Sequence, residues 1–167
     1  AFSQYQKFGF SGLILFSEQK KLGVLFMVTM GLFLLQGLMV EPRVSFTQSV
    51  FGLAVTAMGI ALTAIGQINM GSSWRVGIEE TAKPGLITTG LYQYSRNPIY
   101  SALFMIIGGY FICLPTVISA ILCVFSFFGI REQVLREEVY LFKTYGDEYL
   151  SYVTKVGRFV PWFGRHL

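Results

Sequence analysis

Three long blocks of the chain carry no Asp, Glu, Lys or Arg, and shorter polar segments separate them. The blocks lie between Lys21 and Glu41, between Arg43 and Arg75, and between Arg96 and Arg131. About 20 apolar residues are enough for a helix to cross a bilayer, so each block is long enough to span a membrane. The apolar residues run continuously and do not alternate every second residue, which argues against a transmembrane barrel.

The third block is too long for one span. As a single helix, residues 99–130 would be about 48 Å long, against a hydrocarbon thickness of about 30 Å. Pro115 divides this block into two short antiparallel helices, because proline interrupts a helix interior. We therefore predict an all-α, polytopic transmembrane bundle of about four spans, over 22–40, 50–68, 99–114 and 116–130.

Polar segments flank the spans within a single membrane domain covering 1–167. Residues 1–21 predict a helix lying in the membrane interface, since their apolar run is short and aromatic. Residues 69–98 predict an aqueous loop, and 131–167 a C-terminal region whose amphipathic helix is interrupted near Gly146. A helical hairpin begins and ends at the same membrane surface. The loop before it and the C-terminal helix after it are therefore expected to meet at that surface and enclose one pocket.

Small residues inside the spans predict packing. Glycines 52, 59 and 66 recur every seven residues, and Gly59 and Gly66 are expected to line a face that a neighbouring helix approaches closely. Cys113 and Cys123 lie at different depths of the predicted hairpin, so we expect no disulfide between them. His166 is the only histidine, and no metal-ligand spacing is present.

Composition and charge agree with a membrane protein. The chain is 53% hydrophobic and only 13% charged, whereas soluble domains carry about a quarter charged residues. Four spans would place 12 of the 13 basic residues on one side, which predicts that this side is cytoplasmic and leaves only Arg43 opposite. The net charge of +4 is then explained by topology and attraction to anionic lipids, and no basic tract indicates nucleic acid.

Candidate chemistry concentrates at the cytoplasmic ends of the predicted hairpin. Pro98 favours a helix start after Asn97, and the amides that follow would form a weak anion site. A plain helix start with an interfacial tyrosine explains the same residues. Glu137 and Glu138 have no basic residue four positions on, in contrast to Glu132, which is spaced to pair with Arg136.

Four segments in order carry a resemblance to a known family. Residues 71–161 resemble the integral-membrane isoprenylcysteine carboxyl methyltransferases and their phospholipid methyltransferase relatives. The matching segments are LITTGLY at 86–92, RNPIY at 96–100, the pair Glu137-Glu138, and YGDEYLSY at 145–152.

The resemblance implies S-adenosylmethionine as methyl donor, bound at the cytoplasmic mouth beneath the C-terminal helix. It carries the cofactor contacts over to Pro84, Gly85, Leu86, Ile87, Tyr92, Asn97, Pro98, Ile99, Tyr100 and Glu137. Tyrosine faces attract a cation such as a sulfonium, in agreement with that assignment.

Two positions depart from the family pattern. Asn97 replaces the usual His, which removes a titratable group, and Gln133 stands where the eukaryotic carboxyl methyltransferases have an Arg associated with substrate. Prenylcysteine is therefore not assured as the substrate. Arg131 or Arg136 would orient a carboxylate acceptor, whereas an amine or thiol acceptor would need a base, for which Glu138 is the candidate.

The sequence thus predicts an integral membrane methyltransferase that acts on a lipophilic acceptor among membrane lipids and releases S-adenosylhomocysteine. A phospholipid or small-thiol methyltransferase with the same cofactor site is the enzymatic alternative. The non-enzymatic alternative is a membrane scaffold whose charged C-terminal region recruits partners.

Overall fold

The computed structural model describes residues 12–41, 44–71, 85–161 and 163. Within these residues the protein is helical, with one isolated bridge between Ser95 and Gly157 and no strand. This confirms the all-α prediction for the described part of the chain. The elements are α2 (Gly12–Met39), α3 (Phe46–Met70), the 3-10 helix η2 (Gly90–Gln93), α4 (Pro98–Cys113), α5 (Val117–Tyr145) and α6 (Asp147–Lys155).

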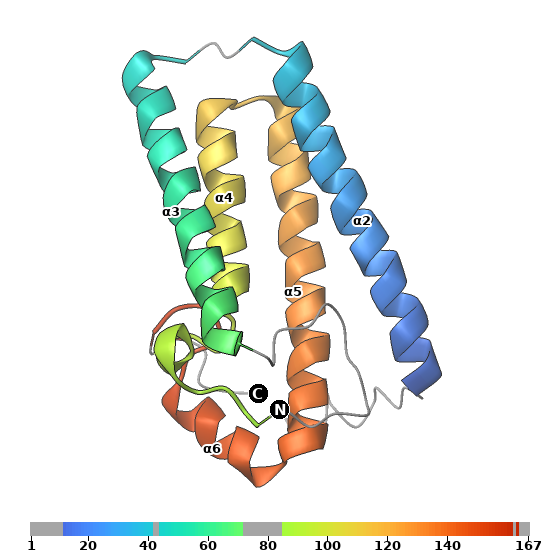
Figure 1. Cartoon of the computed structure of the whole chain (residues 1–167). Helices are drawn as coiled ribbons and strands as arrows, with labels where there is room; N and C mark the ends of the chain where they lie inside the picture. The colour runs from blue at the N-terminus through green and yellow to red at the C-terminus, as the bar shows by residue number, and fades with distance from the viewer. Residues whose placement is uncertain (1–11, 42–43, 72–84, 162, 164–167) are drawn as a thin grey trace.

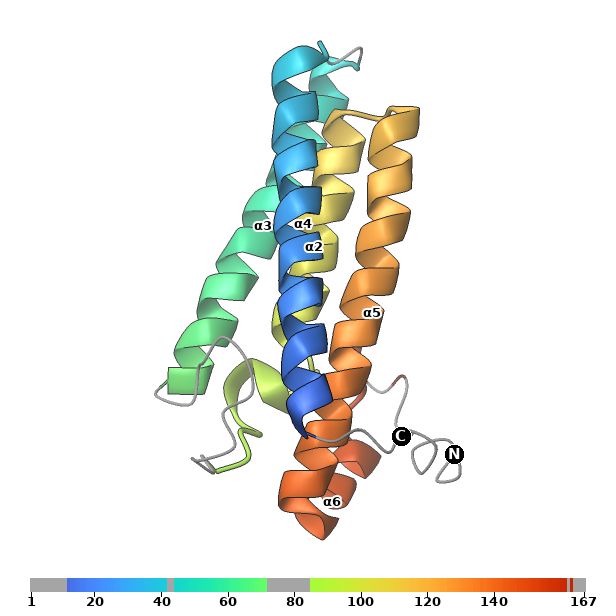
Figure 2. The same cartoon turned by 90° about the vertical axis from the view of Figure 1, so that its right-hand side faces the viewer.

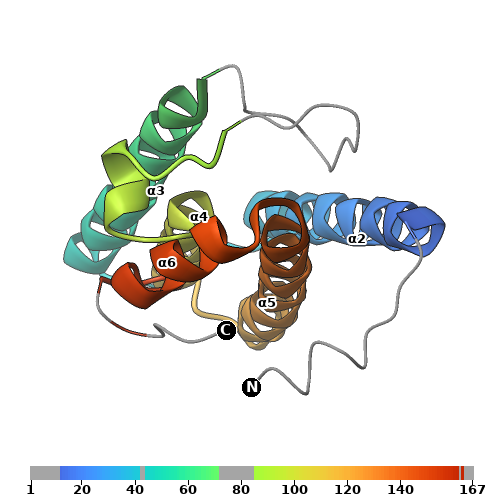
Figure 3. The ribbon, with the colours of Figure 1, turned by 90° about the horizontal axis from the view of Figure 1, so that it is seen from below.

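Four long helices run side by side, and the short α6 lies at one end of them (Figures 1 and 2). Seen from below, α6 crosses beneath α4 (Figure 3). Helices α3 and α5 are each long and apolar enough to cross a membrane. The apolar part of α2, Met27–Met39, and α4 are shorter. The described residues therefore contain two candidate spans of full length, and the count of about four stays a prediction.

The predicted hairpin forms at Pro115. Helix α4 ends at Cys113 and α5 begins at Val117. Thr116 caps α5, because its hydroxyl accepts from the Ser119 amide at 3.1 Å and the Ser119 hydroxyl accepts from the Thr116 amide at 2.9 Å. Cys113 and Cys123 are free thiols, as expected.

Helix α5 continues without a break beyond its apolar part. It has 29 residues, a length of about 43 Å, so its charged second half, residues 131–145, projects past the start of α4 toward α6 (Figure 1). We call residues 131–145 the α5 extension. It ends at Gly146, whose φ of 52° favours glycine, which confirms the predicted interruption.

Helix α2 differs from its expected bounds. The sequence analysis starts the first span at residue 22, after an interfacial segment over 1–21, but α2 begins at Gly12 and runs unbroken to Met39. Residues 18–21 are Glu, Gln, Lys and Lys, which are good helix formers, and no glycine or proline lies between residues 13 and 22 to end a helix. Residues 1–11 lie outside the described part of the chain.

Small residues join α3 closely to α4. Gly52, Gly59 and Gly66 are all buried, as the seven-residue spacing predicts. A Cβ added at Gly59 would lie 2.8 Å from the Ala102 carbonyl oxygen, and one added at Gly109 would lie 2.7 Å from the Gly52 carbonyl oxygen. The two backbones therefore touch, which fixes α4 and the residues at its start against α3.

Candidate active site

The C-terminal tail, residues 156–159, lies alongside the residues that lead into α4. The Arg96 amide donates to the Gly157 carbonyl at 2.9 Å, next to the bridge between Ser95 and Gly157. The Ser101 hydroxyl donates to the Phe159 carbonyl at 2.8 Å. The tail is therefore attached on both sides of the start of α4.

A buried ion cluster joins α5, the start of α4 and the tail. Glu138 has no exposed side-chain surface, and Arg96 is 1% exposed. One Glu138 oxygen lies 3.4 Å from Arg96 Nη2 and accepts from Asn97 Nδ2 at 3.2 Å. The other accepts from Arg158 at 2.7 Å (Nη2) and 3.0 Å (Nε). We call these four residues the Glu138 cluster; both oxygens of its carboxylate are engaged.

A second cluster forms around the neighbouring carboxylate. Glu137 is half-buried, and its Oε1 accepts from the Tyr100 hydroxyl at 2.5 Å and from Gln133 Nε2 at 2.9 Å. Burial raises the pKa of the Glu137 carboxyl; the two hydrogen bonds lower it and the charge of Glu138 raises it, with burial prevailing.

Tyr92 belongs to the same cluster. Burial raises the pKa of its phenol, and the negative charge of Glu137 raises it further. We call Tyr92, Tyr100, Gln133 and Glu137 the Glu137 cluster. Its two hydrogen bonds to the carboxylate come from neutral donors.

The strap, residues 85–93, lies between the helices and α6. Gly90 has φ 62°, and a Cβ there would lie 2.2 Å from Asn69 Oδ1, the atom that accepts from the Leu91 amide at 2.8 Å. Only glycine fits this turn. From the other side, the Tyr152 hydroxyl of α6 donates to the Tyr92 carbonyl at 2.5 Å, so both α3 and α6 hold the strap.

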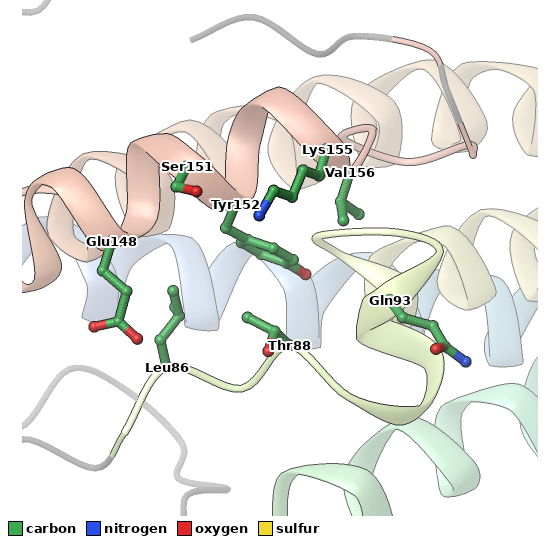
Figure 4. Close-up of a pocket in the computed structure, with 8 residues that line it drawn as sticks. All are labelled: Leu86, Thr88, Gln93, Glu148, Ser151, Tyr152, Lys155 and Val156. Carbon is green, nitrogen blue, oxygen red and sulfur yellow. The ribbon is translucent and has the colours of Figure 1, made fainter.

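A cavity of about 590 Å³ opens between the strap and α6 (Figure 4). Sites for small molecules commonly have volumes of about 300–1,000 Å³, so its size suits a nucleoside-sized ligand. Its walls combine apolar, hydroxyl and charged groups. They come from Leu86, Thr88, Gln93, Glu148, Ser151, Tyr152, Lys155 and Val156.

The structure brings some of the predicted cofactor residues together and places others elsewhere. Tyr92, Tyr100 and Glu137 are brought together, as described above. Leu86 lines the cavity and packs against the tyrosines of α6. Asn97 and Pro98 are buried, with Asn97 bound to Glu138, and Ile99 packs against Gly66 of α3. Gly85 is exposed and Ile87 half-buried, and Pro84 lies outside the described residues.

The predicted catalytic residues Arg131, Arg136 and Glu138 also lie in different surroundings. Arg131 is exposed, and Arg136 pairs with Glu132 at 3.0 Å in the predicted i to i+4 arrangement. Glu138 lies inside its cluster with no exposed surface, whereas a base must reach the proton that it removes. The geometry thus favours a role for Glu138 in holding these segments together.

Sequence reasoning missed Arg158 and the tail. The available signal was the absence of a cation four residues beyond Glu138, which implied a partner elsewhere in the chain. The expected meeting of the loop and the α5 extension is confirmed, because Asn97 contacts Glu138 and Tyr100 contacts Glu137.

Comparison with known families agrees with this arrangement. A family described as Phospholipid methyltransferase matches residues 47–148, from α3 to the start of α6. The chain belongs to this family. The matched range contains the whole Glu137 cluster and all of the Glu138 cluster except Arg158.

Three similar proteins carry the name protein-S-isoprenylcysteine O-methyltransferase. Protein-S-isoprenylcysteine O-methyltransferase B of Arabidopsis thaliana is 33% identical over 116 residues, covering 66% of this chain and 58% of that protein. Protein-S-isoprenylcysteine O-methyltransferase of Saccharomyces cerevisiae is 30% identical over 128 residues, covering 70% and 53%. The Homo sapiens protein of the same name is 31% identical over 118 residues, covering 68% and 41%. The chain thus spans about half the length of these relatives.

A solved structure shares the fold. The eukaryotic intramembrane Ras methyltransferase, isoprenylcysteine carboxyl methyltransferase, superposes with a TM-score of 0.61 at 20% identity. The match covers 94% of this chain and 56% of that chain. The helical arrangement is therefore that of a known integral membrane protein.

Proposed function

We propose that this protein is an integral membrane methyltransferase that uses S-adenosylmethionine to methylate a lipophilic acceptor, in the manner of the isoprenylcysteine carboxyl methyltransferases. Family membership and the names of the relatives support the reaction class. The single structural observation that carries the proposal is the meeting of Tyr92, Tyr100 and Glu137 at the end of the apolar helices.

The residues present fit this donor. S-adenosylmethionine combines a sulfonium and an ammonium group with ribose hydroxyls. A carboxylate such as Glu137 accepts hydrogen bonds from an ammonium or a hydroxyl group, and the faces of Tyr92 and Tyr100 attract a cation. When bound, the donor supplies an activated methyl group. The residues of the chain bind it, orient it toward the acceptor and exclude water.

We further propose four spans, α2 to α5, with the α6 end in the cytoplasm and α6 covering the donor site. The basic residues of the described hairpin and C-terminal region gather at that end, in agreement with the positive-inside rule. They are Arg96, Arg131, Arg136, Lys143, Lys155 and Arg158. The soluble donor then enters from the cytosol and the acceptor from the bilayer.

The acceptor belongs to one of two lipophilic classes. A carboxylate such as that of isoprenylcysteine is suggested by the named relatives, and Arg131 or Arg136 would orient it. A phospholipid is suggested by the name of the matched family. Methylation assays with prenylcysteine, phosphatidylethanolamine and alkanethiols separate these classes and also test a small thiol.

Binding of S-adenosylhomocysteine to the purified, detergent-solubilised chain tests the proposed function. Isothermal titration calorimetry is expected to give micromolar binding that is lost in Glu137→Ala and in Tyr100→Ala. Glu132→Ala is the matched control, because Glu132 lies on the same helix and pairs only with its neighbour Arg136 among the contacts described. No detectable binding by folded wild-type protein would contradict the proposal and favour a scaffold.

A further inference from the structure

Two consecutive glutamates of α5 bind the same helix start. Glu138 accepts from Asn97, the residue before α4, and Glu137 accepts from Tyr100, three residues later. Asn97 is the N-cap residue of α4 and Tyr100 lies in its first turn, so both contacts act on the start of α4. The separation between the α5 extension and the start of α4 is therefore set at two neighbouring points.

The tail is held at the first of these points. Arg158 bonds to Glu138 through its guanidinium, and its carbonyl accepts from Asn97 Nδ2 and from the Ser95 hydroxyl, each at 3.2 Å. Glu138 thus joins three parts of the chain, which are the residues before α4, the helix α5 to which it belongs, and the tail.

The contacts of Glu138 leave it little freedom. Its side chain is fully buried; two nitrogens of the Arg158 guanidinium bond to one carboxylate oxygen, and Arg96 and Asn97 hold the other. Removing one member of such a cluster leaves another charge buried without compensation. The neighbouring Glu137 is half-buried, and among the described residues no guanidinium group clamps it, so its position depends on what holds α5 and α4 together.

We propose that Glu138 is a positioning residue for the methyl-transfer site: through Arg96 and Arg158 it clamps the tail against the start of α4 and thereby sets Tyr100 against Glu137. The inference rests on the proposed function, since it concerns the same donor site. It replaces the role of Glu138 as a base with one exerted through the Glu137 cluster.

Arg158→Gln and Glu138→Gln test this inference. Arg158→Gln is the milder change, because the Arg158 side chain is 25% exposed and the pair of Arg96 with Glu138 remains. Arg158→Lys keeps the charge, and Glu132→Gln makes the same chemical change as Glu138→Gln in a side chain that is 45% exposed. Each protein is assayed for thermal unfolding, for S-adenosylhomocysteine affinity by calorimetry, and for hydrogen–deuterium exchange over residues 95–101 without ligand.

The expected result is that folded Arg158→Gln and Glu138→Gln bind S-adenosylhomocysteine about tenfold or more weakly, because small displacements of Tyr100 and Glu137 spoil the geometry of the site. Exchange over residues 95–101 should rise in both variants, Arg158→Lys should recover part of the affinity, and Glu132→Gln should match wild type. A purely structural role would lower the unfolding temperature and leave the affinity of the folded protein unchanged.

Two outcomes would overturn the inference. One is wild-type affinity and wild-type exchange in the folded variants. The other is that neither variant folds, which would make the cluster a determinant of folding and not of positioning. If wild-type protein does not bind S-adenosylhomocysteine, the proposed function fails, and the exchange measurement alone reports whether the clamp holds the start of α4.

Discussion

Glu137 and Glu138 are neighbours on α5, but their surroundings differ in kind. Glu138 is fully buried, and two guanidinium groups and an amide engage both of its oxygens. Glu137 is half-buried and receives its hydrogen bonds from a phenol and an amide. A carboxylate saturated by cations contributes to structure, whereas one held by neutral donors can still bind a cationic or hydroxylated ligand. The comparison predicts that stability depends strongly on Glu138 and weakly on Glu137.

The largest effect is expected from Glu138→Ala. This change removes a buried carboxylate that contacts Arg96 and Arg158, and should lower the free energy of unfolding by about 3–5 kcal/mol. Glu132→Ala removes a partly exposed pair on the same helix and should cost less than about 1 kcal/mol. Unfolding by denaturant in micelles measures both values. Equal losses of stability in Glu138→Ala and Glu132→Ala would contradict the structural importance of the buried Glu138 cluster.

Glu137→Gln should weaken ligand binding with little effect on stability. Stability should change by less than about 1 kcal/mol, because the amide still accepts from Tyr100. Affinity for S-adenosylhomocysteine should fall about tenfold or more, the usual scale for losing a hydrogen bond to a charged group. Calorimetry beside denaturant unfolding measures the two quantities. A variant that loses stability and keeps its affinity would assign Glu137 to structure.

Glu137 should make the stability of the protein depend on pH. Burial raises the pKa of its carboxyl, so at pH values between the ordinary carboxyl pKa and the raised one the folded protein keeps a proton that the unfolded chain has released. Its stabilising contribution is complete below the ordinary pKa and is lost as the pH rises through the raised pKa. Glu137→Gln should abolish this decrease. Denaturation series at several pH values test it, and an unchanged slope in the variant would contradict the assignment.

The smallest effects are expected from removing the hydroxyl groups of Tyr100 and Tyr110, two tyrosines of α4. Tyr100→Phe removes the hydroxyl that donates to Glu137, and Tyr110→Phe removes one that donates to the Phe33 carbonyl at 2.6 Å at the other end of α4. Each should cost about 0.5–1.5 kcal/mol of stability. Only Tyr100→Phe should weaken S-adenosylhomocysteine binding, by a few-fold. If Tyr110→Phe weakens binding to the same degree, the effect is not specific to the Glu137 cluster.

Features encoded by local pattern were predictable from the sequence. Pro115 and Gly146 mark helix ends because proline lacks an amide donor and glycine accepts a positive φ. The glycines of α3 mark a helix contact because their spacing places them on one face. The contact between the start of α4 and the α5 extension followed from the geometry of a hairpin, which requires no knowledge of side chains.

Features that depend on distant pairing were not predictable. Arg158 binds Glu138 from 20 residues away, and Arg96 lies 42 positions before it, so no periodic pattern relates them. Asn97 is predicted as a cofactor contact, and the sequence gives no sign that its side-chain amide donates to that buried carboxylate. The start of α2 at Gly12 does not follow from the polarity of the chain, because residues 18–21 are polar and yet continue the helix.

A structure of the chain with S-adenosylhomocysteine bound tests the central claim most directly. The account predicts that the ligand contacts both Glu137 and Tyr100 at the α6 end, while Glu138 keeps its bonds to Arg96 and Arg158. A ligand that touches neither Glu137 nor Tyr100 would contradict it.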